Sequence, residues 1–168
     1  MKKYNIVLSL ASVILFFGCP VGMSFAPGEP GTEVLDERIV GTWITSDEFS
    51  VFKKAEVAKA DSYSFRVKLY ETTDMYVLGG ETELQGWTTR VDEQPLLYVL
   101  SAELNEYFTY GYAFREGGIL LYDAALLDGG KDSVVSTQSF RTQLAASVKK
   151  EEWYAEPVFY EKLSAENK

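Results

Sequence analysis

The chain contains no histidine and a single cysteine, Cys19. Histidine is the commonest general base and the commonest metal ligand, so its absence removes the usual routes to acid–base catalysis and metal binding. One cysteine cannot form an internal disulfide or a thiolate zinc site. Asp128 and Asp132, which flank a glycine pair, supply too few oxygens for calcium. The sequence therefore predicts no catalytic residue, no metal site and no cofactor.

The first part of the chain lacks a hydrophobic run long enough for a transmembrane helix. The apolar stretch from Ile6 to Phe17 would span about 18 Å as a helix, which is short of a hydrocarbon core of about 30 Å. It follows Lys2 and Lys3 and is followed by Gly18. Positive residues before a short apolar run are typical of a signal peptide, which we place at residues 1–18.

Positive charge is also scarce. The chain has 16 Lys and Arg residues against 25 Asp and Glu residues, a net charge of −9. Without Lys2 and Lys3 the balance is 14 against 25, or −11. An acidic surface repels nucleic acid and anionic lipid head groups, so we expect no nucleic-acid partner. The simplest role of this charge is solubility.

Proline and glycine are concentrated just after the signal peptide. Residues 20–36 contain three of each and few large apolar residues, which predicts an extended linker. A flexible coil of that length would have an end-to-end distance of roughly 20–25 Å. The length of 168 residues favours one domain. We therefore expect a tether over residues 19–36, a folded domain over residues 37–164 and a tail over residues 165–168.

Aromatic residues are abundant, with eleven Tyr, ten Phe and three Trp, and this favours β structure. Tyr63 to Leu69 and Tyr107 to Arg115 alternate between apolar and polar or small residues, as half-buried antiparallel strands do. Further strands are expected at 38–45, 49–54, 75–78, 81–91, 96–102, 119–123 and 158–163. A meander of so many short strands removes its edges best by closing. The predicted fold is mainly β, an antiparallel up-and-down barrel of about eight strands.

One helix is predicted before the final strand. From Gln138 to Glu152 the apolar residues recur with helical spacing, at positions i, i+4, i+5 and i+8. These residues are Phe140, Leu144, Ala145 and Val148. Ser136 or Thr137 can cap the first turn. We expect an amphipathic helix of about four turns.

The sequence Phe16-Phe17-Gly18-Cys19 resembles the lipobox of bacterial lipoproteins. The resemblance implies cleavage before Cys19, attachment of a lipid such as palmitate to the cysteine sulfur, and acylation of the new amino terminus. Two or three acyl chains anchor a protein stably. It thus implies a lipid-anchored protein of the bacterial cell envelope, at the outer membrane. Ordinary secretory cleavage after Ser24-Phe25-Ala26 is the alternative, which Pro27 disfavours.

Gly41-Thr42-Trp43, on the first predicted strand, resembles the Gly-x-Trp signature of lipocalin-like (calycin) barrels. A helix just before the last strand is also the arrangement of that family. The resemblance covers about residues 37–164 and is strongest to small bacterial lipoproteins. It implies that Trp43 packs across the closed end of the barrel and that a basic side chain of the last strand covers it. Lys162 is the candidate for that side chain.

The interior of such a barrel either holds one small ligand or is filled by side chains. Tyrosines would provide polar contacts on an apolar wall. The candidate cavity lining is Tyr63, Phe65, Trp87, Phe108, Tyr110, Tyr112 and Phe114. The main functional hypothesis is therefore non-catalytic binding of a small apolar molecule. The alternative is that these aromatics merely fill the interior.

Two other functions compete with ligand binding. A glycosidase would need paired carboxylates, and Glu81, Glu83 and Asp123 are candidates, but none lies in a recognisable motif. A structural or assembly lipoprotein would bind another envelope protein through a strand edge or an exposed aromatic patch. The glycine pairs of the chain predict turns and not phosphate-binding loops. An aromatic strip outside the barrel would favour assembly, and an enclosed cavity would favour ligand binding.

Overall fold

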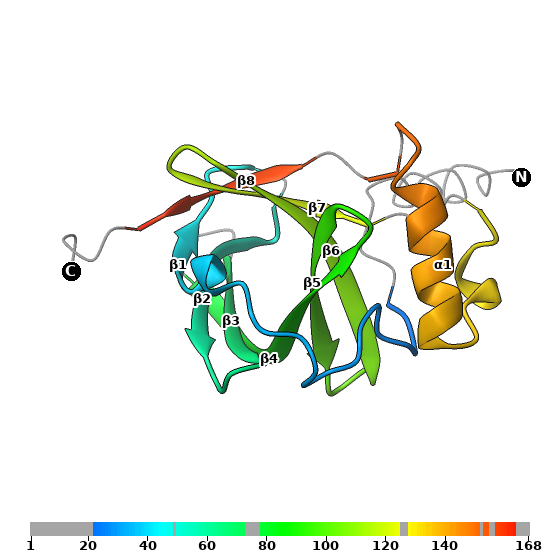
Figure 1. Ribbon diagram of the computed structural model, residues 1–168. Helices are drawn as coiled ribbons and strands as arrows, with labels where there is room; N and C mark the ends of the chain where they lie inside the picture. The colour runs from blue at the N-terminus through cyan, green and yellow to red at the C-terminus, as the bar shows by residue number, and fades with distance from the viewer. Residues whose placement is uncertain are drawn as a thin grey trace, which may run out of the picture.

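The protein folds into a closed barrel of eight antiparallel strands. The structure is a computed structural model and describes residues 22–48, 50–72, 78–124, 128–151, 153–154 and 157–163. Strand order follows sequence order, and the last strand pairs with the first (Figure 1). The predicted mainly β, up-and-down barrel is confirmed, and its architecture is consistent with a calycin-like fold. The predicted signal peptide, Cys19 and the tail lie outside the described residues.

The strands are joined mainly by short turns. In chain order the elements are β1 (Gly41–Ile44), β2 (Phe52–Lys59), β3 (Phe65–Thr72), β4 (Leu78–Val91), β5 (Gln94–Ser101), β6 (Glu106–Arg115), β7 (Gly118–Asp123), α1 (Thr137–Ser147) and β8 (Val158–Lys162), with 3₁₀ turns at Glu37–Ile39 and Lys131–Ser133. Gly79 and Gly80, where the sequence predicts a turn or a bulge, lie within β4 and not in a turn. The register of β3 with β4 shifts beside them, where glycine is tolerated in a strand.

Side chains alternate between the barrel interior and its outer surface. The aromatic face of β6, which carries Tyr112, packs in the interior with Val67 of β3. On β5 both faces are covered: Leu97 and Val99 pack inside, whereas Leu96 and Tyr98 belong to clusters on the outside. This two-sided burial accounts for the continuous apolar sequence of β5, because alternation appears only where one face meets water.

Helix α1 lies against the outer surface of the barrel (Figure 1). Ser136 caps it, since its side chain accepts a hydrogen bond from Ser139 N and the Ser139 side chain accepts one from Ser136 N. Phe140 and Leu144 are buried against Leu96. The helix ends at Ser147, short of the predicted end at Glu152, because the apolar periodicity stops at Val148 and charged residues follow. No helix in the described ranges is long and apolar enough to cross a membrane.

The segment before β1 packs on the barrel, so the predicted free tether over residues 19–36 is wrong for the described residues 22–36. Met23 pairs with Tyr107 of β6 through backbone hydrogen bonds of 2.9 and 2.7 Å. Ala26 packs on the outside of the barrel, and Leu35 enters the interior cluster. The segment runs between α1 and β1 (Figure 1). Proline and glycine keep the backbone extended here, and the few apolar side chains between them are enough to dock it.

Adjacent residues of this segment provide a direct test of its packing. Leu35 is 5% exposed and Val34 is 76% exposed. Leu35→Ala should lower the free energy of unfolding by about 2–4 kcal/mol, because it removes a buried side chain and leaves a cavity. The matched control Val34→Ala should change it by less than about 0.5 kcal/mol. Urea denaturation of both variants measures the difference. Equal, small effects would mean that the segment is a free tether.

Candidate functional site

The barrel encloses a cavity of about 110 Å³. Its wall is almost entirely apolar and comes from β1, β2, β3, β5, β6, β7, β8 and the 3₁₀ turn before β1. The lining residues are Ile39, Trp43, Phe52, Ala55, Val57, Val67, Leu69, Leu97, Val99, Tyr110, Ile119, Leu121 and Tyr160. A cavity of about 150 Å³ in another protein binds benzene, so this volume suits one small ring or a short chain.

The cavity is partly open, and the exposure of its wall shows at which end. Ile39, in the turn before β1, and Trp43 of β1 are both buried. Phe52, Tyr110 and Leu121, which also line the cavity, are half-buried. Phe52 begins β2 and Leu121 lies near the end of β7, at the opposite end of the barrel from the Glu37–Ile39 turn. We call the first end, at the Glu37–Ile39 turn, the closed end. The second, where β1 leads into β2 and β7 finishes, is the open end.

The predicted closure residues Gly41, Trp43 and Lys162 lie together at the closed end. Trp43 and Lys162 are direct partners across the β1–β8 pair, and Lys162 Nζ lies 5.0 Å from the centroid of the Trp43 ring. The Lys162 ammonium also donates a hydrogen bond of 3.2 Å to Arg38 O. Gly41 has φ +148°, and a Cβ atom there would lie 2.6 Å from Lys162 Cε. Glycine is therefore needed for the lysine stem to cross the tryptophan.

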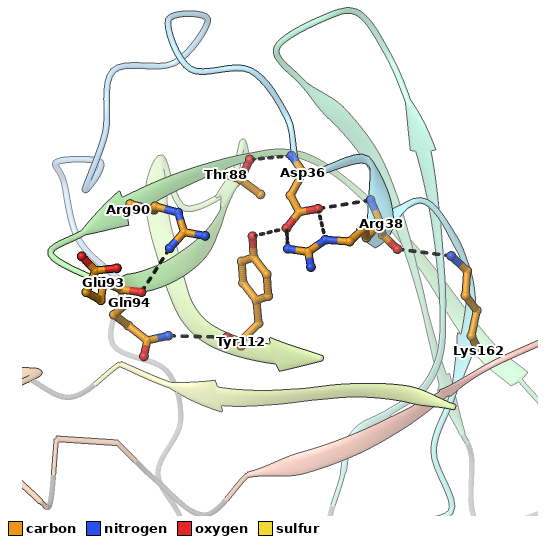
Figure 2. Close-up of polar contacts among 8 residues, drawn as sticks. All are labelled: Asp36, Arg38, Thr88, Arg90, Glu93, Gln94, Tyr112 and Lys162. Carbon is orange, nitrogen blue, oxygen red and sulfur yellow. Dashed lines mark hydrogen bonds and ion pairs between the residues drawn. The ribbon is translucent and has the colours of Figure 1, made fainter. Parts of the chain in front are cut away.

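A carboxylate fixes the segment of residues 36–40 before β1, here called the strap, which crosses the closed end (Figure 2). Asp36 accepts hydrogen bonds from Arg38 Nε at 2.8 Å and from the Tyr112 hydroxyl at 3.0 Å. Its own backbone N–H donates to Thr88 Oγ1 at 3.2 Å. The Arg38 hydrogen bond is the main reason why the pKa of Asp36 is lowered, with Tyr112 adding to it. Asp36 is thus a charged, fully engaged group that ties the strap to β4 and β6.

Most of the predicted lining residues lie inside the barrel, but only Tyr110 borders the cavity. Phe65 and Tyr112 are buried in the interior cluster, and Phe108 and Phe114 pack against it. These four side chains fill interior space beside the cavity. Both hypotheses for the aromatic face therefore hold in part: Tyr110 forms cavity wall, and the other four side chains fill the interior.

Tyr63 and Trp87 are not in the interior. Tyr63 lies in the turn before β3 and is 41% exposed. Trp87 follows Gly86, whose missing side chain faces Val67 and Val99 of the interior, so Trp87 points outward. There it stacks on Tyr98 with ring centroids 5.5 Å apart and packs with Ala26. The prediction was wrong because strand alternation assigns the interior to Leu84, on the opposite face of β4 from Trp87.

The lining residues missed by sequence reasoning are mostly aliphatic. Val57, Val67 and Val99 occupy inward positions of strands whose alternation is visible in the sequence. They could have been found by extending the aromatic face of β6 to its neighbours through the register. Ile39 and Tyr160 carried no such signal, because the strap and the last strand have too few residues for a periodic pattern.

Asp123 ends β7 on the interior side, beyond Ile119 and Leu121 of the cavity wall. It lies directly opposite Tyr110, another wall residue, in the β6–β7 register. Burial raises the pKa of Asp123 to about 6 from 3.8. The charge of Asp123 also contributes to the raised pKa of Tyr160, for which burial is the main cause. Asp123 does not border the cavity itself, but it is an acidic group on the interior face of β7, next to wall residues at the open end.

The comparisons with known proteins assign nothing to this site. No family model matches the chain, and no curated protein or solved structure matches it. The residue chemistry is also restrictive, since the described ranges contain no group of three or more acidic, histidine or cysteine side chains placed to hold a metal ion. Any proposal must therefore rest on the cavity and the groups around it.

The raised pKa of Asp123 predicts a pH-dependent cost to the fold. Between pH 3.8 and about 6 the folded state keeps the proton that the unfolded state releases. The contribution of Asp123 to the free energy of unfolding therefore falls as the pH rises through this window and is level above it. Asp123→Asn should raise stability at pH 7.5 by about 1 kcal/mol, a value discounted for the half-exposed site. It should have little effect at pH 3.5.

Thermal unfolding of both proteins across pH 3.5–8 measures this difference. About 1 kcal/mol corresponds to a rise of about 2–4 °C in Tm for a chain of this size. A variant that is less stable than the wild type at pH 7.5 would mean that the ionised carboxylate has a stabilising partner.

Proposed function

We propose that the protein is a lipid-anchored, lipocalin-like envelope protein that binds a small apolar molecule in its barrel cavity without catalysis. The observation that carries the proposal is the partly open cavity of about 110 Å³ with an apolar wall. Ligand sites are concave, mostly apolar and largely pre-formed, and the mouths and interiors of barrels are a common place for them. The size of the cavity limits the enclosed part of the ligand to about one ring or a short alkyl chain.

Two features favour this function over assembly with another envelope protein. The barrel is closed, so the strands that the structure describes offer no free edge for pairing. The outward aromatic pair of Trp87 and Tyr98 is buried with Ala26 and does not form an exposed strip. The barrel interior, in contrast, keeps an unfilled apolar volume next to well-packed aromatics.

A pair of substitutions on β2 tests the cavity proposal. Ala55 lines the cavity, whereas Ala58 is exposed on the opposite face of the same strand. Ala55→Leu should fill much of the volume and weaken the binding of toluene at least tenfold, because the ring loses its space. Ala58→Leu adds the same atoms outside and should leave the affinity unchanged. Ligand-observed NMR titrations of the wild type and both variants measure the dissociation constants.

Unfolding curves confirm that both variants remain folded before the affinities are compared. Toluene binding that is equal in Ala55→Leu and Ala58→Leu would place the ligand elsewhere. No measurable binding of toluene or other single-ring probes to the wild type would contradict the proposal as a whole.

The anchoring part of the proposal rests on the lipobox-like sequence that ends at Cys19. We expect the protein in the membrane fraction to have the mass of a chain that starts at Cys19 and carries acyl groups. Cys19→Ala should lose both the acyl mass and the membrane attachment, because no thiol is left to accept the lipid. Mass spectrometry and fractionation of the two proteins provide the measurement. An unchanged mature mass and unchanged attachment would refute lipidation.

A further inference from the structure

Asp123 lies beside three wall residues at the open end of the cavity, as three observations show. It follows Leu121 of the cavity wall by two residues, so both side chains lie on the interior face of β7. It is directly opposite Tyr110, and opposed residues of an antiparallel pair share a face with Cβ atoms about 5 Å apart. Its charge also acts on the hydroxyl of Tyr160, a third wall residue.

The Asp123 carboxylate has no partner in the described part of the chain. No hydrogen bond and no ion pair reaches it, and burial alone accounts for its perturbation. This is unusual, because buried or half-buried carboxylates are normally paired or hydrogen-bonded. Asp36 at the closed end shows the normal case, with an arginine and a tyrosine hydroxyl as donors. A carboxylate beside the cavity that is unpaired among the described residues points to a partner other than those residues.

The surroundings of Asp123 favour a positive partner. The hydroxyl of Tyr160 is engaged with Ser50 at 3.0 Å and with Phe52 O at 3.1 Å. A second acidic group, Asp47, also raises the pKa of Tyr160, after burial and in the same sense as Asp123. Two acidic side chains therefore act on one end of an apolar cavity.

We propose that the cavity ligand is a small organic cation, an apolar ring or chain that carries an ammonium group, with Asp123 as its counter-ion. The inference rests on the proposed ligand-binding function and narrows its ligand class. The apolar body fills the space between Trp43 and Leu121, and the ammonium group emerges at the open end beside the carboxylate. The aromatic rings of Tyr110 and Tyr160 add faces on which a cation is stabilised.

A metal ion or a neutral ligand explains the site less well. Metal ions need several converging oxygens, and the described residues hold no such group. A neutral ligand would leave the Asp123 charge unpaired in the complex and more deeply desolvated, which costs binding free energy. An ammonium group cancels the charge and donates hydrogen bonds to both oxygens of the carboxylate.

The test compares benzylamine with benzyl alcohol, which have the same ring and chain length and differ in charge at pH 7.5. We expect the full-length chain to bind benzylamine about tenfold or more tightly than benzyl alcohol, as a charge-assisted hydrogen bond implies. Asp123→Asn should reduce that ratio to about one. Glu116→Gln is the matched control, because it removes one negative charge from the exposed turn at the closed end. It should keep the tenfold preference.

Isothermal titration of the three proteins with both probes separates the outcomes. If neither probe binds the wild type, the ligand-binding function itself fails. If benzyl alcohol binds the wild type as tightly as benzylamine, the cavity binds ligands but the cationic class is wrong. A preference for benzylamine that survives in Asp123→Asn would overturn the role of Asp123. A thermal unfolding curve of Asp123→Asn, expected at or above that of the wild type, confirms that the variant is folded.

Discussion

The pairing of β1 with β8 is the contact on which the barrel depends, because it joins strands more than a hundred residues apart and turns an open sheet into a closed one. The described part of this seam is short, with the register pairs Trp43–Lys162 and Ile44–Glu161. A further backbone hydrogen bond of 2.9 Å runs from Leu163 N to Thr42 O. A seam of this length needs support from side chains, and the closed end supplies it.

That support explains why the closed end is so densely connected. The lysine stem crosses the tryptophan ring above a glycine that leaves room for it, and its ammonium group binds Arg38 O of the strap. The strap is in turn held by Asp36, which reaches Tyr112 on β6. Seam, strap and interior aromatics are thus one connected unit. The cavity lies against this unit, with Ile39 and Trp43 in its wall, and opens toward the other end of the barrel.

The sequence carried enough information for the barrel, because its strands alternate, its turns are short and its helix has a clear cap at Ser136. It also carried the closure group, since Trp43 and Lys162 occupy the first and last strands. The predictions from the sequence were wrong where they did not take the position of individual side chains into account. The proline and glycine content of residues 20–36 indicated a tether, yet Met23 and Leu35 dock that segment. Trp87 was predicted to line the cavity, although the register directs it outward.

The sequence offered Asp123 only as one of several candidate carboxylates, because no motif around it distinguishes it from the others. The carboxylates of Asp36 and Asp123 lie toward opposite ends of the barrel and differ in whether hydrogen-bond donors surround them. Asp36 is surrounded by donors that lower its pKa, and this stabilises the fold near neutral pH. Asp123 is partly buried and has no donor among the described residues, and this burial raises its pKa to about 6 and makes its charge a cost to the folded state. Nothing in the closure of the barrel requires an acid at that position, where a threonine or valine would suit a strand end beside an apolar cavity. The cost is therefore best explained by a function of the cavity, and a cationic ligand is the partner that would remove it.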